Sequence, residues 1–319
     1  MNTKSLRVLQ AVGALAVVAT PAAAQRPDRP TVRAELTRRV AADAGDANAP
    51  LLLCIGLHIE PLGAAVSKLA GNPLPAPKLP PGPPRPGGKL PGGPGGVRPP
   101  PSYQLRPFFT RHVADIRQLA AIVEQHGGRL TVQAQTPFTS VAAESGETVL
   151  RDLERQGHEI ALHFHEDAHL GRGSERLEIA TWAAVMREEI EWIRRSGAAG
   201  RIRYWSGGNL YPGVLEAAAQ AGLEVMSDHK NPRRQQTDER LLAVHPWRPA
   251  GGPTEENLDA FARHDPQGRI VYLPDGVFSR VDHAGMRRSE ELGGDWRYFD
   301  FLTEGLELSL RAARSDRVN

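Results

Sequence analysis

Residues 157–171 read GHEIALHFHEDAHLG, and this stretch indicates both a fold class and a chemistry. It holds four of the 11 histidines of the chain and three carboxylates. Its first half alternates as a β-strand does, with Ile160 and Leu162 on one face and Ala161 and His163 on the other. Neutral imidazole is the commonest protein ligand for zinc and related ions, so the second half suggests a metal site.

Strand-like and helix-like segments alternate on both sides of this stretch. The expected strands are Leu51–Ile59, Leu130–Gln135, His158–His163, Arg201–Trp205, Leu223–Ser227, Leu241–His245 and Ile270–Leu273. The expected helices are Thr110–Gln125, Glu147–Gln156, Glu175–Arg195, Pro212–Ala221, Glu255–Arg263 and Phe299–Arg314. Repeated strand–helix units predict an α/β fold with parallel strands and helices outside. With about seven strands, a closed or nearly closed barrel fits better than an open sheet.

The composition is that of an ordinary globular protein of 319 residues, 40% hydrophobic and 24% charged. We expect a single barrel domain over residues 51–319. The formal charge of +2 gives no reason to expect nucleic acid or an anionic membrane as a partner. The single cysteine, Cys54, excludes an internal disulfide, and its aliphatic neighbours Leu53 and Ile55 indicate a small core side chain.

The first 24 residues have the pattern of a secretory signal peptide. Lys4 and Arg7 precede a short apolar run, Val12–Val18, and small residues at 22–24 provide a cleavage site before Gln25. The apolar run is shorter than the roughly 20 residues that a membrane-spanning helix needs. We therefore expect an exported protein, periplasmic or secreted, with no transmembrane segment after cleavage and a polar tail at 25–50.

A Pro/Gly-rich segment at 73–101 interrupts the pattern. It contains thirteen of the 27 prolines, seven glycines, four basic residues and no acidic ones. Such a composition favours an extended segment without helix or sheet. We interpret it as an insertion in the barrel domain, because too little sequence precedes it to form a separate domain.

The carboxyl ends of the expected strands carry polar, aromatic or ionisable side chains. They are His58 and Glu60; Gln133, Gln135 and Thr136; His163, His165, Asp167 and His169; Arg203, Trp205 and Ser206; Ser227, Asp228 and His229; His245, Trp247 and Arg248; and Asp275. In a barrel of parallel strands these ends meet on one face, where the chemistry of such folds lies. Seven converging ends predict a functional site.

Several ligand sets for a divalent metal, with zinc favoured, compete within the histidine-rich stretch. His163 and His165 point to one side together if the strand continues. His165 and His169 are four residues apart, as are His163 and Asp167, and that spacing places side chains on one face of a helical turn. Glu60, from another strand, could complete a set of three with a position left for water. His163 is the firmest ligand, and the second could be His165, Asp167 or His169.

A family resemblance adds to this interpretation. GHEIALH at 157–163 resembles the G-H-E-I-x-x-H start of the second motif of polysaccharide deacetylases, the NodB-type group of carbohydrate esterase family 4. IRYWSGG at 202–208, followed by 215–226 and Asp228, is similar to the third region of that family. The resemblance covers roughly 51–273. It implies a distorted (β/α)7 TIM-like barrel of the glycoside hydrolase/deacetylase type, in which one Asp and two His hold zinc or a related divalent metal.

Two motifs of the family differ here. Its first motif, T-F-D-D, supplies a base and a metal ligand, but residues 57–60 read LHIE. Glu60 can replace the ligand, whereas Ile59 cannot act as a base, so His58 would take that role. The final L-x-H motif, which supplies the acid, has no match near 273–275, where Asp275 is the candidate.

These observations lead us to expect a metal-dependent hydrolase that removes acetyl groups from a carbohydrate. The expected site residues are His58 and Asp275 for proton transfer; Glu60, His163, His165 and His169 as metal ligands; and Gln135, Arg203, Trp205 and Trp247 for substrate binding, with the two tryptophans stacking on sugar rings.

Two other functions remain compatible with the sequence. One is a catalytically lapsed barrel that binds glycan without turning it over, favoured by the altered base and acid motifs. The other is a glycosidase on a related barrel, which needs two carboxylates roughly 5 to 10 Å apart, with Glu60 and Asp275 as candidates.

Overall fold

A computed structural model describes residues 52–59, 66–71, 102–171, 173–207, 210–227 and 237–276, together with 303, 305–310 and 313. The side chains of Asp167 and Glu239 are not part of the described set. The expected signal peptide, the polar tail and the Pro/Gly-rich insertion lie outside these ranges, so those expectations stay predictions.

Six parallel strands form one sheet in the order β1-β2-β3-β4-β5-β6. They are β1 (Ile55–Ile59), β2 (Leu130–Ala134), β3 (Glu159–His163), β4 (Tyr204–Ser206), β5 (Val225–Ser227) and β6 (Val271–Tyr272). The register pairs His58 with Gln133, Gln133 with Ala161, and His163 with Ser206. Each strand therefore lies next to the strand that precedes it along the chain.

Helices connect the strands. They are α2 (Arg106–Gln125), α3 (Phe138–Ser145), α4 (Val149–Arg155), α5 (Glu166–Leu170), α6 (Ile179–Arg195), α7 (Val214–Ala221) and α8 (Leu258–Ala262). Short 3-10 turns occur at η1 (Lys68–Ala70), η2 (Ser174–Arg176), η3 (Glu239–Leu241) and η4 (Glu255–Asn257), and residues 305–310 are helical. In the described part of the chain no helix is long and apolar enough to cross a membrane.

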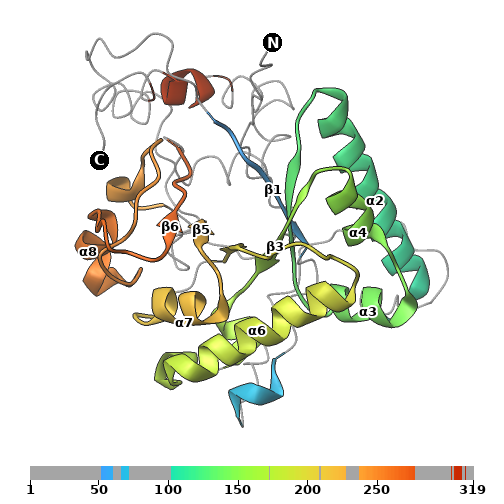
Figure 1. Ribbon diagram of the computed structural model, residues 1–319, viewed down its shortest axis with the longest axis horizontal. Helices are drawn as coiled ribbons and strands as arrows, with labels where there is room; N and C mark the ends of the chain where they lie inside the picture. The colour runs from blue at the N-terminus through green and yellow to red at the C-terminus, as the bar shows by residue number, and fades with distance from the viewer. Residues whose placement is uncertain are drawn as a thin grey trace, which may run out of the picture.

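The sequential strand order determines where the helices lie. Crossovers between parallel strands are right-handed, so a sheet whose order never reverses has its helices on one face. Figure 1 shows α2, α3, α4, α6, α7 and α8 around the outside of the strands, with α6 running beneath the middle of the sheet. None of these six helices lies on the opposite face of the sheet, which corresponds to the inner face of a barrel and is called the helix-free side below.

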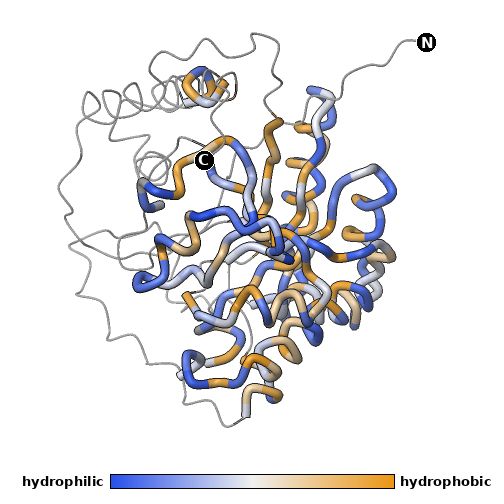
Figure 2. Tube along the Cα trace, turned by 60° about the vertical axis from the view of Figure 1, so that its left-hand side comes forward, coloured by the Kyte–Doolittle hydropathy of each residue, from blue (hydrophilic) through white to orange (hydrophobic). Residues whose placement is uncertain are grey.

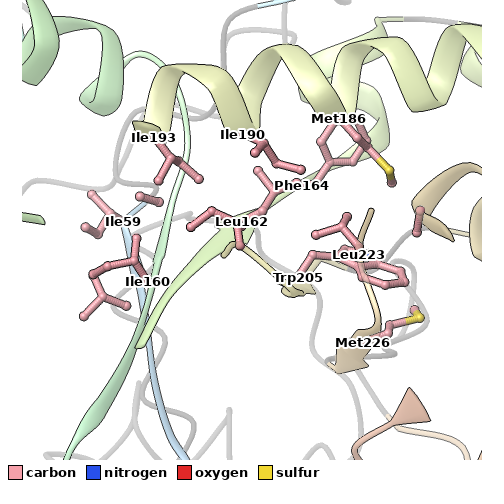
Figure 3. Close-up of a cluster of buried hydrophobic side chains, with 14 of the residues drawn as sticks. Ile59, Ile160, Leu162, Phe164, Met186, Ile190, Ile193, Trp205, Leu223 and Met226 are labelled. Carbon is pink, nitrogen blue, oxygen red and sulfur yellow. The ribbon is translucent and has the colours of Figure 1, made fainter. Parts of the chain in front are cut away.

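The hydrophobic core lies between the sheet and α6. Met186, Ile190 and Ile193 project from α6 toward Leu162 and Phe164, with Trp205 and Met226 beside them (Figure 3). These side chains are buried. The helices show hydrophobic and hydrophilic residues in alternation along the tube, as expected when one helix face packs on a sheet (Figure 2).

The structure confirms the α/β fold with parallel strands and outer helices, and it corrects some of the details. Residues 241–245 form no strand: η3 ends at Leu241, and Ala243 makes one isolated antiparallel bridge with Gly276. Helix α3 was not expected. The expected barrel is tested only in part: the described residues form a six-stranded parallel sheet in which β1 and β6 do not pair, and this arrangement is compatible with a barrel-like fold.

Candidate functional site

Strand alternation assigns each side chain to the helix side or to the helix-free side of the sheet. Ile59 and Leu162 lie in the core under α6 (Figure 3), so their neighbours His58 and His163 point to the opposite side. The alternation of β3 is the one expected from its sequence. The helix-free side is polar, because it carries His58, Gln133, His163, Ser206 and Ser227, all buried.

Three histidines gather on this side near the carboxyl ends of β1 and β3. The ring centroids of His58 and His163 are 4.3 Å apart, and those of His163 and His165 are 4.6 Å apart with the planes nearly perpendicular. His58 and His163 are buried, whereas His165 is half-buried. The structure thus brings together three of the residues expected at the site.

Ser206 of β4 connects these histidines to the neighbouring strands. Its Oγ lies 2.9 Å from His163 Nδ1 and 3.3 Å from His58 Nε2, and it donates to Gln133 Oε1. With its hydroxyl proton directed to Gln133, the Ser206 oxygen is placed to accept a hydrogen bond from His163 Nδ1. A histidine protonated at Nδ1 carries its lone pair on Nε2, which is the form that binds a metal through that nitrogen.

The network extends to β5. Gln133 Nε2 donates to Tyr204 Oη at 3.4 Å, and Tyr204 Oη bonds to Ser227 Oγ. The glycine at position 56 leaves the space that the Gln133 side chain needs, since a Cβ there would lie 2.8 Å from Gln133 Nε2. Hydrogen bonds therefore run across β1, β2, β3, β4 and β5 on one face, which holds the buried polar groups in fixed positions.

These contacts show that the helix-free face is strongly concave. Adjacent strands are about 4.8 Å apart, so β1 and β4 would be separated by about 14 Å in a flat sheet. A serine and a histidine side chain cannot span that gap, yet Ser206 Oγ and His58 Nε2 are 3.3 Å apart. The sheet curves around the site, and the side chains of distant strands meet inside the curve.

Gln135 follows β2 on the same side as Gln133. Its side chain is 0% exposed, and neither its Oε1 nor its Nε2 has a hydrogen-bond partner among the described residues. The β2–β3 register extends to place it opposite His163. A buried amide without partners is costly, so Gln135 is suited to bind a further polar group.

His169 lies on the other side of the sheet from this site. Its ring stacks on Phe164 with centroids 4.3 Å apart and a 13° tilt, and its Nε2 lies 3.7 Å from Glu189 Oε2. Phe164 belongs to the core under α6 (Figure 3), so the ring of His169 faces the core. The geometry supports His165 as the partner of His163, because in the described contacts the ring of His169 touches His165 only at its backbone and faces the core. Asp167 has no described side chain.

Three residues expected to bind substrate lie away from the concave face. Arg203 is exposed and precedes β4, at the amino edge of the sheet. Trp205 is 0% exposed and packs in the core with Leu223 and Met226 (Figure 3). Trp247 is 4% exposed, and its Nε1 donates to Phe261 O at 2.7 Å. The two rings offer no open face for a sugar in this arrangement.

The misplacement of Arg203 and Trp205 has one physical cause. Side chains alternate between the two faces along a strand. If the alternation is assigned one residue out of step, every side chain is placed on the wrong face of the sheet. In β4 the residues that point inward are Tyr204 and Ser206.

The remaining expected residues are only partly described. Asp275 is half-buried after β6, and its Oδ2 accepts a hydrogen bond from Thr237 Oγ1 at 3.1 Å. Glu60 and Asp228 lie outside the described residues. Within the described ranges, no group of three or more His, Cys, Asp or Glu side chains is arranged so that it could hold a metal ion.

Cys54 lies at the amino end of the same face. Its Sγ is 3.2 Å from Thr131 Oγ1, and burial raises the pKa of the thiol, to which the charge of Glu159 adds. A thiol with a raised pKa is a poor nucleophile at neutral pH. Cys54 is half-buried, so it is less enclosed than the core position that its aliphatic neighbours predicted.

Sequence reasoning missed two residues, Tyr204 and Glu189. With the correct alternation along β4, the side chain of Tyr204 would have been predicted on the same face of the sheet as that of Ser206. Glu189 interrupts the apolar face of α6, where Trp182, Met186 and Ile193 are its buried neighbours at helical spacing. A carboxylate within such a face is a signal that can be read from sequence, because charged residues are rarely buried without partners.

A scan against protein-family models finds no match, and searches of curated proteins and of solved structures find no significant match either.

Proposed function

We propose that this protein is an exported, metal-dependent hydrolase similar to the polysaccharide deacetylases, which removes acetyl groups from a carbohydrate. The observation that supports this most is the meeting of His58, His163 and His165 on the concave face, with ring centroids 4.3 and 4.6 Å apart. The proposal includes closure of the curved sheet into a distorted (β/α)7 barrel, which the sequential order of six parallel strands supports.

The donor chemistry on this face fits a zinc ion or a related divalent ion. His163 contacts Ser206 through Nδ1, which directs Nε2 away from that serine, and the ring of His165 lies 4.6 Å from its own, centroid to centroid. The described residues do not complete a ligand set, so a further donor is required. Glu60, which follows β1 directly in the sequence, is the candidate, and a His/His/carboxylate set leaves a position open for water.

The residues of the chain have separate roles in the proposed reaction. A divalent ion supplies Lewis-acid activation of water and of the substrate carbonyl when it is bound. His58 accepts the proton from the attacking water, since its ring lies against that of His163. Ser206 holds both imidazoles in place, and Gln135 provides an amide donor and acceptor for the substrate. Asp275 is the candidate acid for the leaving group.

Metal content and acetate release from acetylated glycans test this function. The purified protein should bind one zinc ion and release acetate, and His163→Ala should abolish both. His126→Ala, at an exposed histidine directly after the end of α2, is the matched control and should change neither. A wild-type protein without stoichiometric metal would contradict the proposal, and glycan binding without turnover at any metal loading would favour a lapsed, glycan-binding barrel.

Export is tested separately. The basic residues Lys4 and Arg7, the apolar run Val12–Val18 and the alanines at 22–24 support a cleaved signal peptide. Expression of the whole chain in a bacterial host should yield a periplasmic or secreted product whose amino-terminal residue is Gln25.

A further inference from the structure

A buried carboxylate on α6 contacts the loops that follow two different strands. Glu189 is 3% exposed and lies on the face of α6 that packs against the sheet. Its Oε2 accepts from the backbone N of Thr136 at 2.8 Å, and its Oε1 accepts from Thr136 Oγ1 at 2.7 Å. Both carboxylate oxygens therefore hold the residue directly after Gln135.

The same carboxylate faces the loop after β3. His169 Nε2 lies 3.7 Å from Glu189 Oε2, with both side chains buried. The other ring nitrogen of His169 is 2.8 Å from the backbone O and 3.0 Å from the backbone N of His165. His169 thus connects Glu189 to the backbone of His165, and its stacking on Phe164 fixes the plane of the ring.

The preceding residue of α6 extends this arrangement to the segment after β1. Ser67 Oγ donates to Glu188, and Ser67 N donates to His169 O at 2.8 Å. Segments after β1, β2 and β3 are thereby attached to one turn of α6. Loops that carry functional side chains need such support, because a small displacement of a donor group changes its chemistry strongly.

We propose that Glu189 is a positioning residue: through Thr136 and His169 it sets the positions of Gln135 and His165 relative to each other on the concave face. The assignment of those two residues to a metal and substrate site rests on the proposed function, but the coupling of the two loops does not. Loss of a purely structural carboxylate would lower the stability of the whole fold. Loss of a positioning residue would loosen the loops after β2 and β3 together and would weaken metal binding at the site.

Backbone amide exchange of the full chain tests the coupling directly. Glu189→Leu removes both acceptors, and Glu189→Gln keeps one carbonyl oxygen and the shape of the side chain. In Glu189→Leu the amides of residues 135–136 and 165–169 should exchange about 10- to 100-fold faster, the factor expected when a hydrogen bond to a charged group is lost. Glu189→Gln should give a smaller acceleration at the same two segments.

Matched variants separate this effect from general loosening. Glu191→Gln changes an exposed carboxylate on the same helix, which pairs with Arg195, and should leave both segments at wild-type rates. Thr136→Ser keeps the hydroxyl that Glu189 accepts from and should behave as wild type, whereas Thr136→Val should accelerate exchange at both segments. Faster exchange at 135–136 alone, or uniform acceleration over the whole sheet, would overturn the proposal.

Zinc affinity provides the readout that a purely structural role would not change. Calorimetric titration should give a Kd about 10- to 100-fold weaker in Glu189→Leu than in Glu191→Gln, the range typical of lost supporting contacts around a metal. Wild-type affinity in Glu189→Leu would overturn the positioning role. A wild-type protein that binds no zinc would contradict the proposed function, and the exchange rates would still decide whether the two loops are coupled.

If Glu189→Leu does not fold, the exchange rates of Glu189→Gln and Thr136→Val decide whether the two loops are coupled.

Discussion

The rings of His58 and His163 are 4.3 Å apart, although their strands β1 and β3 are separated by β2. In a flat sheet the two strands would be about 10 Å apart and their side chains would project in parallel. The contact therefore depends on the curvature of the sheet. A site that depends on curvature also depends on the side chains that cross the concave face, and Ser206 is one of these, in contact with His58, His163 and Gln133.

Ser206→Ala should weaken the site and destabilise the fold. The substitution removes the hydroxyl that donates to Gln133 Oε1 and that contacts His163 Nδ1, so both side chains lose a hydrogen-bond partner. We expect a loss of about 1 to 3 kcal/mol in the free energy of unfolding and a zinc affinity lowered about 10- to 100-fold. Urea unfolding and calorimetric zinc titration measure the two quantities.

Ser145→Ala is the matched control for this prediction. Ser145 is exposed, and its hydroxyl donates only to carbonyls of its own helix in the described contacts. Its substitution should change the free energy of unfolding by no more than about 0.5 kcal/mol. Equal effects of the two substitutions would show that the hydrogen bonds of Ser206 have no special importance.

His165→Ala should affect zinc binding, whereas His169→Ala should mainly affect thermal stability. His165 lies beside His163 on the concave face, so its removal should abolish stoichiometric zinc binding. His169 packs on Phe164 against α6, so its removal should lower the thermal midpoint while one zinc ion still binds, with reduced affinity. Metal analysis after gel filtration, combined with thermal unfolding, distinguishes them. Retention of stoichiometric zinc by His165→Ala and its loss in His169→Ala would reverse the ligand assignment.

The sequence predicted the elements of the fold well because their periodicity is strong. The alternation of Ile160 and Leu162 with His163 has the period of a strand, and α6 has an apolar face at helical spacing that only Glu189 interrupts. Residues 241–245 were misassigned because a short apolar segment, LLAVH, fits a strand as well as a buried turn. Tertiary packing beside β6 decided the outcome, and local sequence does not encode that packing.

The site was predicted less completely for two physical reasons. Phase along β4 decides whether Tyr204 and Ser206 or Arg203 and Trp205 point inward, and both pairs look plausible in a strand of three residues. The rings of His165 and His169 lie on opposite sides of the sheet because α5 begins at Glu166, soon after β3 ends, and this helical turn places the ring of His169 on the helix side. The spacing of four residues alone did not show this.

Gly207→Ala should be among the most destabilising single substitutions near the site. Gly207 has φ +129°, and a Cβ there would overlap the backbone carbonyl of Phe164. The carbonyl belongs to a backbone that also pairs with β4, since Phe164 N donates to Ser206 O at 2.8 Å, so it cannot move without disturbing β3. We expect a loss of about 3 kcal/mol or more in the free energy of unfolding.

Gly222→Ala isolates the steric part of that loss. Gly222 has φ +89° at the end of α7, and a Cβ there has no described atom within 4 Å. Only the backbone strain of a left-handed residue remains, about 1 to 2 kcal/mol. Denaturant unfolding of the two variants should differ by the cost of the clash, and similar losses would mean that Phe164 can move aside.

The pH dependence of stability should depend in part on His158. Its Nδ1 accepts from Leu130 N at 2.8 Å, and burial lowers its pKa below the ordinary value, while a hydrogen bond with Glu124 partly opposes the shift. The unfolded chain, whose histidines titrate near pH 6.5, then binds more protons than the folded protein below that pH. Stability must therefore decrease as the pH falls below about 6.5, and it continues to decrease down to the lower pKa of the folded state.

Two substitutions should change this dependence in opposite directions. His158→Asn retains an acceptor for Leu130 N but has no titratable ring, so the free energy of unfolding should fall less between pH 7.5 and 5.5 than it does in wild type. Glu124→Gln removes the group that raises the pKa of His158, so the fall should be larger. Urea unfolding at both pH values, with a chelator present to exclude effects of bound metal, measures the difference.

Part of the pH dependence of stability should persist in His158→Asn, because burial also lowers the pKa of His112. If both substitutions shifted the dependence in the same direction, the source of the acid sensitivity would lie elsewhere than in the buried neutral ring of His158.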